Sequence, residues 1–263
     1  MDKTEIKYVD MGLGLKLSYI HLDRNSANFI VIFPQGQRTA EFALNKYFEI
    51  LPEDFNIMAF DQPGTGNSDS FGLNSDPKTI AEYVLTALRK HGYKTERTIL
   101  MGKSLSSSYP IACVSIDSSF HSLVIISGYK FLTRRMAMVC YPMIKYITGK
   151  FILRYMIDKT IKFLDHFSNF KKGYVDLSDS NRWITLSNLI KFRLEDNVVN
   201  IPIYILWHEH DELIPSTTRA EILHECKNAQ TYIIPTRGHW NESPVEYDYL
   251  KDIFELIKQK MNT

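Results

Sequence analysis

The sequence contains few cysteines, no large excess of either charge and no long apolar run, and each absence excludes a class of protein. Its 263 residues include three cysteines, Cys113, Cys140 and Cys226, which are far apart and form no CxxC pair. This pattern is typical of reduced thiols in a reducing compartment and argues against a disulfide framework or a zinc module. The formal net charge of +1 gives no general attraction to nucleic acid.

Signals for membranes and for common cofactors are also absent. No segment approaches the ~20 consecutive apolar residues that a membrane-spanning helix requires, so no membrane insertion is expected. Residues 1–5 are not followed by the apolar stretch of a secretion signal. Neither a G-x-G-x-x-G motif nor a Walker lysine motif occurs, and we expect no cofactor. We predict a cytoplasmic protein whose 44% hydrophobic residues suffice for a substantial core.

Short apolar segments alternate with helical periodicities along most of the chain. Strands are predicted at residues 15–22, 29–33, 56–60, 97–101, 122–126, 203–207 and 231–234. Helices are predicted at residues 40–51, 77–92 and 245–260. Continuous apolar runs, such as residues 29–33, are typical of strands that are buried on both faces. This order predicts an α/β fold with a mainly parallel central sheet flanked by helices.

The residues around position 104 predict a sharp turn that exposes one hydroxyl. An apolar strand ends at Gly102, Ser104 follows two residues later, and small residues then open a helix. A serine hydroxyl is a weak nucleophile at neutral pH and requires a neighbouring base. Ser104 is therefore a candidate nucleophile if the chain also supplies that base.

Two later segments supply a candidate acid and a candidate base. Asp211 ends an apolar strand, and His239 follows another strand and a glycine, shortly before the last helix. The order Ser, Asp, His is that of the α/β-hydrolases, and the chain resembles this superfamily over nearly its whole length. The resemblance implies that Ser104 attacks an acyl carbon, that His239 moves the proton, and that Asp211 orients the imidazole.

The chain departs from the family pattern at two positions. In the G-x-S-x-G motif of the superfamily, Ser106 occupies the place of the last glycine. Many relatives have a histidine where this chain has Gln35, just before Gly36. The resemblance implies an oxyanion hole formed by the backbone N–H groups of Leu105 and Gln37. The alternative for this second segment is a plain turn at the end of a strand.

Polar residues beside Asp211 offer competing interpretations. His208 and His210 stand at i and i+2 of a predicted strand, so their imidazoles could share a face. A further ligand at metal-binding spacing is missing, and we expect no metal site. Glu209 and Glu212 lie close by as alternatives to the acid, and we rank both below Asp211.

A glycine-rich loop at residues 61–68 resembles the D-x-x-G-x-G-x-S loop of the same superfamily. A G-x-G pattern alone is a weak signal for phosphate binding. We therefore interpret the loop as structural support near the mouth of the site, with Asp61 as a non-catalytic residue.

Residues 129–196 interrupt the alternation, because they contain helical patterns and no convincing strand. Between residues 129 and 172 there are ten Lys and Arg against two Asp and Glu, a charge of +8 that leaves −7 for the rest. Many α/β-hydrolases carry a helical lid at this point. We predict that residues 129–196 form a cap inserted after the sixth strand into a core made of 1–128 and 197–263. The basic charge either attracts an anionic substrate or a membrane surface, or forms a solvated face.

The resemblance implies acyl transfer, since a serine at the turn argues against relatives that use an aspartate nucleophile on epoxides or alkyl halides. The leading prediction is a serine hydrolase that cleaves a small carboxylic ester, with a small-molecule acyl substrate as its partner. A thioesterase or acyltransferase acting on a carrier-bound acyl group would use the same three residues. A non-catalytic ligand-binding protein of this fold is the third alternative, and the presence of all three candidates argues against it.

Overall fold

The computed structural model describes residues 5–12, 14–35, 38–70, 76–128, 200–211, 219–220, 223, 228–237 and 244–262. The predicted cap at 129–196 lies outside the described residues. None of the helices in the described part of the chain is long and apolar enough to cross a membrane.

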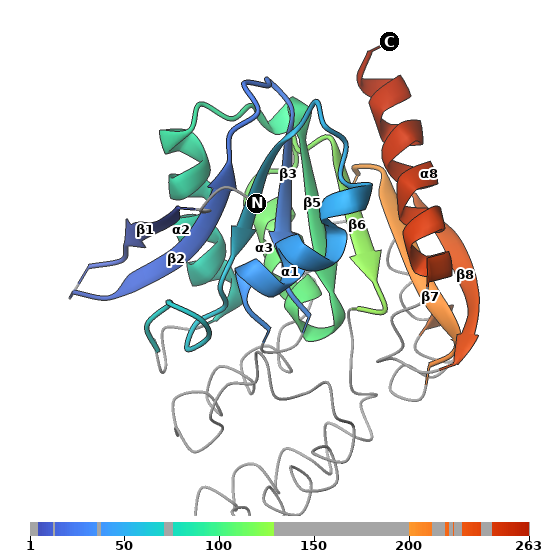
Figure 1. The fold of residues 1–263 in the computed structure, drawn as a ribbon, viewed down its shortest axis with the longest axis horizontal. Helices are drawn as coiled ribbons and strands as arrows, with labels where there is room; N and C mark the ends of the chain where they lie inside the picture. Colours follow the sequence, from blue (N-terminus) through green and yellow to red (C-terminus); the bar gives the residue numbers. More distant parts are fainter. Residues whose placement is uncertain are drawn as a thin grey trace, which may run out of the picture.

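The described residues form an eight-stranded sheet with helices on both faces (Figure 1). The strands are β1 (Ile6–Asp10), β2 (Lys16–Leu22), β3 (Phe29–Phe33), β4 (Asn56–Phe60), β5 (Thr98–Lys103), β6 (Ser122–Ile126), β7 (Ile203–His210) and β8 (Ala229–Arg237). The helices are α1 (Ala40–Tyr47), α2 (Pro77–Lys90), α3 (Ser108–Ile116) and α8 (Pro244–Met261), with shorter 3₁₀ turns at η1 (Phe48–Ile50), η3 (Thr95–Arg97) and η4 (Ser104–Ser107).

The sheet is parallel except at one side. Its order is β1-β2-β4-β3-β5-β6-β7-β8. The pairs β1/β2 and β2/β4 are antiparallel, and all the others are parallel. The predicted mainly parallel α/β sheet is therefore confirmed. The carboxyl ends of β3 and β5–β8 meet at one edge, which is where sheets of this kind place their binding sites.

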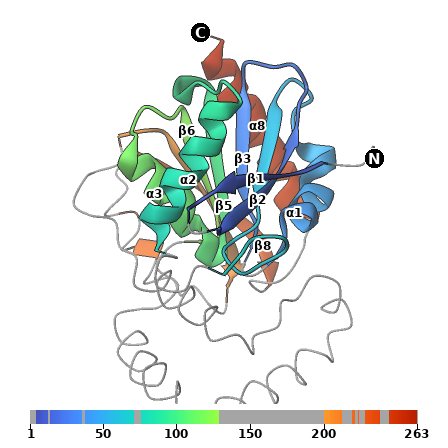
Figure 2. The same ribbon diagram turned by 90° about the vertical axis from the view of Figure 1, so that its left-hand side faces the viewer.

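Two apolar cores lie on opposite faces of the sheet. Helices α2 and α3 cover one face, and α1 and α8 cover the other (Figure 2). Strand β3 shows the alternation: Val31 packs into the core beneath α2 and α3, whereas Ile30 and Ile32 pack into the core beneath α1 and α8. A strand covered on both faces must be apolar at every position, which explains its continuous run.

The helix boundaries follow from local capping. Helix α2 begins as predicted, because the side chain of Asp76 accepts hydrogen bonds from the N–H groups of Lys78 and Thr79, both at 3.1 Å. The helix predicted at 40–51 is shorter, since α1 ends at Tyr47 and continues only as the 3₁₀ turn η1. Leu51 adopts an extended conformation because it precedes Pro52, and a residue before proline disfavours the helical region.

Strand β1 was not predicted from the sequence. It pairs with β2 at the end of the sheet, and only Val9 within it is fully buried. Its sequence, IKYVD, has no continuous apolar run. Its apolar residues Ile6 and Tyr8 are 41% and 44% exposed. An edge strand with one strand neighbour carries too weak a periodicity to be recognised.

The imidazole of His21, in β2, lies against that of His91 and makes the folding stability depend on pH in the acid range. The rings of His21 and His91 lie 4.1 Å apart between centroids. Burial, followed by the charges of His91 and Lys7, lowers the pKa of His21 to about 4. Protonation therefore favours the unfolded chain, and the contribution of His21 to stability is complete above the ordinary pKa of about 6.5 and is lost as the pH falls through about 4.

We expect His21→Phe to reduce the loss of thermal stability between pH 7 and pH 4, because phenylalanine keeps the stacking on Phe29 without a titrating group. Thermal unfolding of the wild type and the variant across this range tests it. His210→Phe, at a histidine whose side chain is 64% exposed, is the matched control for the substitution itself. An equal fall in Tm between pH 7 and pH 4 in the wild type and in His21→Phe would contradict the expectation.

Candidate active site

Ser104 stands directly after β5, on a tight turn into α3. Its φ of +59° lies in the left-handed region, which is uncommon for a residue other than glycine. The turn closes against the strand because Gly102 has no side chain: a Cβ there would lie 2.7 Å from Ser107 Cα and 2.8 Å from Pro110 Cγ. The Ser107 hydroxyl donates to the Ser104 carbonyl at 2.6 Å. Backbone strain held by close packing is typical of functional turns.

The exposure predicted for the Ser104 hydroxyl is wrong in this structure. Ser104 is 3% exposed. The turn is packed against the segment that follows β6, where a Cβ at Gly128 would lie 2.4 Å from Ser107 Oγ. Sequence identifies the turn but not how closely the neighbouring strand end packs on it.

Ser106, the first departure from the family motif, has a defined structural role. Its hydroxyl donates to the carbonyl of Lys103 at 2.6 Å and is also bonded to the carbonyl of Pro34. Gln62 Nε2 donates to the same Pro34 carbonyl at 2.7 Å. Pro34 follows β3 and begins the segment that leads to Gln37. The serine therefore ties the turn at Ser104 to this segment, which a glycine could not do.

We expect Ser106→Ala to lower kcat about tenfold with little change in KM, because the two segments then lose their direct bond and shift relative to one another. Steady-state kinetics on a chromogenic ester measures the change. Ser115→Ala removes a comparable hydroxyl-to-carbonyl bond within α3, to Ile111, and should leave kcat unaltered. An unchanged kcat in Ser106→Ala would contradict a role for the bond in the site.

Asp211 lies at the same edge of the sheet as Ser104. It follows β7 directly, it is buried, and its N–H donates to the His208 carbonyl at 3.2 Å. Strand β8 runs parallel to β7 and ends at Arg237, two residues before His239. His239 itself lies outside the described residues. The structure thus brings Ser104 and Asp211 to the carboxyl ends of β5 and β7, with β6 between them.

The predicted oxyanion-hole donors are described only in part. Leu105 follows Ser104 in η4, and it is half-buried and packed on the core beneath α2 and α3. Gln37 lies outside the described residues. The Gln35–Gln37 segment follows β3, the strand that pairs in parallel with β5. Its start is therefore adjacent to the turn that bears Ser104.

The loop at residues 61–68 is held in place by a buried carboxylate at its start. The buried carboxylate of Asp61 accepts hydrogen bonds from the Ser18 hydroxyl and the Ala40 N–H, each at 2.6 Å, and from the Asn67 N–H at 3.0 Å. Gly66 has φ +53°, and a Cβ there would lie 2.3 Å from this carboxylate. These contacts support the interpretation of the loop as structural, and the non-catalytic role of Asp61 stays a prediction.

His208 and His210, whose imidazoles the strand period allows to share a face, lie in different surroundings. His208 is fully buried, whereas the side chain of His210 is 64% exposed. The pairing of β7 with β8 shifts its register at this point, since His208 pairs with Ile234 and His210 pairs with Arg237. Glu209 has a side chain that is 52% exposed, and Glu212 lies outside the described residues. Within the described ranges, no group of three potential metal ligands comes together.

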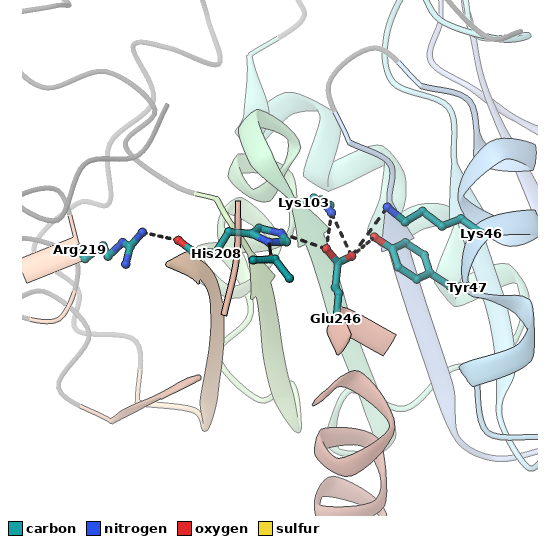
Figure 3. Close-up of polar contacts among 7 residues, drawn as sticks. Lys46, Tyr47, Lys103, His208, Arg219 and Glu246 are labelled. Atoms are coloured by element: carbon teal, nitrogen blue, oxygen red, sulfur yellow. Dashed lines mark hydrogen bonds and ion pairs between the residues drawn. The ribbon is translucent and has the colours of Figure 1, made fainter. Parts of the chain in front are cut away.

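A buried ionic cluster that was not predicted from the sequence lies beside the site, on the face covered by α1 and α8 (Figure 3). Its centre is Glu246, in the first turn of α8. The Glu246 carboxylate accepts from Lys103 Nζ at 2.7 and 2.9 Å and from His208 Nε2 at 3.1 Å. Lys46 Nζ lies 3.7 Å away, and the Tyr47 hydroxyl donates at 3.4 Å.

Lys103 and Glu246 keep their charges despite burial. Burial lowers the pKa of Lys103 to about 8, and the Glu246 charge opposes this shift. Burial also opposes ionisation of Glu246, but Lys103, the hydrogen bond from His208 and Lys46 together hold its pKa well below its usual range. One sequence signal was available: Glu246 shares the spacing of Leu250, Ile253 and Ile257, the buried stripe of α8.

Neither a family model nor a curated protein sequence matches this chain. Several solved structures, in contrast, match this chain. An esterase from Thermogutta terrifontis aligns with a TM-score of 0.74 at 12% identity, covering 98% of this chain and 100% of the other. An α/β-hydrolase fold protein from Chitinophaga pinensis aligns with a TM-score of 0.65 at 12% identity, covering 98% and 96%. The chain has the α/β-hydrolase fold. The resemblance inferred from its motifs is confirmed at the level of architecture.

Other structures of the α/β-hydrolase fold show how widely its chemistry varies. An epoxide hydrolase from Bacillus megaterium aligns with a TM-score of 0.66 at 16% identity, covering 97% of this chain and 99% of the other. An esterase and an epoxide hydrolase thus share this architecture. At such identities the likeness establishes the fold alone, and the reaction must be argued from the residues of the site.

Proposed function

We propose that the protein is a serine hydrolase that cleaves a small carboxylic ester through an acyl-enzyme. The observation that carries the proposal is the strained backbone of Ser104, with φ +59°, at the carboxyl end of a central parallel strand. An α/β-hydrolase places its nucleophile on such a turn between strand and helix. A serine there favours acyl chemistry over the opening of epoxides by a carboxylate nucleophile.

In the proposed mechanism Ser104 Oγ attacks the ester carbonyl while His239 accepts its proton. Asp211 holds the imidazole in the correct tautomer and stabilises the imidazolium. The backbone N–H groups of Leu105 and Gln37 stabilise the oxyanion of the tetrahedral intermediate. His239 then protonates the leaving alcohol, and water, activated by the same imidazole, releases the acid and restores Ser104.

Two further observations support these roles. Asp211 lies at the same sheet edge as Ser104 and is buried, as an orienting carboxylate requires. Ser106 connects the Ser104 turn to the segment before Gln37, so the two proposed oxyanion donors belong to segments that are bonded to each other. Another buried carboxylate, Asp61, already accepts three hydrogen bonds within the fold.

Hydrolysis of a chain-length series of p-nitrophenyl esters tests the proposal. We expect saturable turnover with an optimum at short acyl chains. Absence of turnover on every ester in the series would contradict an esterase function and leave a carrier-bound acyl donor to be examined, which acyl transfer from a thioester tests directly.

A further inference from the structure

We propose that Glu246 is a positioning residue for this reaction: its buried carboxylate fixes the relative positions of the chain segments that carry Ser104, Asp211 and His239. The inference rests on the proposed function. It assigns a role to a residue that lies outside the triad and outside the oxyanion hole. Contacts lead from Glu246 to Lys103, beside Ser104, and to His208, on the strand before Asp211 (Figure 3).

The first contact reaches the residue next to the nucleophile. Lys103 is the last residue of β5 and directly precedes Ser104. Its fully buried ammonium group donates to both carboxylate oxygens of Glu246, at 2.9 and 2.7 Å. The strained turn at Ser104 is therefore held from the other face of the sheet, because the side chain before it ends in a two-point ion pair.

The second contact reaches the strands that lead to the acid and the base. An ionised carboxylate only accepts hydrogen bonds, so His208 Nε2 donates to Glu246, at 3.1 Å. His208 Nδ1 bonds the Thr236 hydroxyl at 2.7 Å. His208 precedes Asp211 by three residues, and Thr236 precedes His239 by three. One imidazole thus links β7 and β8 to the same carboxylate.

The third link is the polypeptide chain that joins His239 to Glu246. Glu246 lies in the first turn of α8, seven residues after His239. The helix is anchored on the sheet by Leu250, Ile253 and Ile257, all fully buried. In the sequence, His239 therefore lies between Thr236, which is bonded to His208, and Glu246.

Burial of these charges is difficult to explain as a source of stability. An apolar residue at position 246 would complete the buried stripe of α8, and replacing buried ion pairs by apolar groups is often neutral or stabilising. Apolar packing is not directional, however, whereas the carboxylate forms directional hydrogen bonds with Lys103, His208 and Tyr47. We therefore infer that the cluster serves the geometry of the site and not the stability of the fold.

The test is Glu246→Gln, which keeps the shape of the side chain and removes its charge. We expect kcat on the best p-nitrophenyl ester to fall about 10- to 100-fold with KM changed less than about threefold, since a small displacement of reacting groups has effects of this size. The rate at which a fluorophosphonate labels Ser104 should fall in parallel. Ile257→Ala, which creates a cavity under the same helix, lowers Tm by about 5–15 °C but should keep kcat at 25 °C.

The outcomes separate the two proposals. A wild-type protein that no fluorophosphonate labels overturns the proposed function, and this inference with it. A wild-type protein that is labelled, together with Glu246→Gln labelled at the same rate and unchanged in kcat, overturns the inference alone. A kcat loss equal in Glu246→Gln and Ile257→Ala also overturns it, because destabilisation then accounts for the effect.

A second variant decides the matter if Glu246→Gln does not fold. Thr236→Val is nearly isosteric and removes only the bond to His208 Nδ1. We expect kcat to fall about three- to tenfold at constant KM. An unchanged kcat in this variant would overturn the inference.

Discussion

Ser104→Ala reduces ester turnover by about 10⁴- to 10⁶-fold, the loss seen when a serine nucleophile is removed from a triad. Alanine keeps the Cβ, so the strain of the φ +59° backbone and the packing of the turn are unchanged. Tm should therefore shift by less than about 2 °C. The measurement is steady-state hydrolysis of a p-nitrophenyl ester, accompanied by thermal unfolding.

Ser108→Ala is the matched control for this variant. Ser108 is the first residue of α3, it is nearly as buried as Ser104, and it has no role in the proposed mechanism. We expect it to retain kcat within about twofold. Turnover that survives in Ser104→Ala, or that is lost equally in both variants, would contradict the assignment of Ser104 as the nucleophile.

Asp61→Ala produces a large loss of stability, with kcat preserved in the folded protein. Removal of the carboxylate leaves the Ser18 hydroxyl and the Ala40 and Asn67 N–H groups without their acceptor. Breaking such a buried network costs about 3–5 kcal/mol, which lowers Tm by roughly 10 °C. Denaturant unfolding and kcat, measured on the same preparations, test both halves of the prediction.

Asp54→Ala is the control for removing a negative charge from an aspartate that is not buried. Asp54 forms an ion pair with Lys258 at 2.9 Å, and its side chain is 49% exposed. Exposed pairs of this kind contribute less than about 1 kcal/mol. A kcat in Asp61→Ala that falls more than a hundredfold at unchanged stability would contradict the structural role given to Asp61 and make it a candidate for the chemistry.

The elements near the site follow closely from local sequence. The runs at 29–33, 56–60 and 122–126 coincide with β3, β4 and β6, because central parallel strands are apolar at every position. Helix α2 starts where its Asp-Pro cap predicts. The turn at Ser104 is recognisable because Gly102 and the small residues after it are required by the close packing there.

The features that sequence reasoning missed depend on distant contacts. Lys103 and Glu246 are 143 positions apart, and no local pattern pairs them. His208 is buried against Glu246 whereas the side chain of His210, two residues later, is 64% exposed, and a period of two does not distinguish them. Ser106 looked like a weakened glycine position, and its bond to Pro34 became visible only when β3 and β5 were placed side by side.

The central claim is that Ser104 is an activated nucleophile, and covalent labelling tests it most directly. The protein is incubated with a fluorophosphonate, and the intact mass and the modified peptide are determined by mass spectrometry. The account predicts one adduct per chain, located on Ser104, that forms more slowly in Glu246→Gln and is absent from Ser104→Ala. A wild-type protein that remains unmodified, or one modified at another residue while Ser104 stays free of adduct, would contradict it.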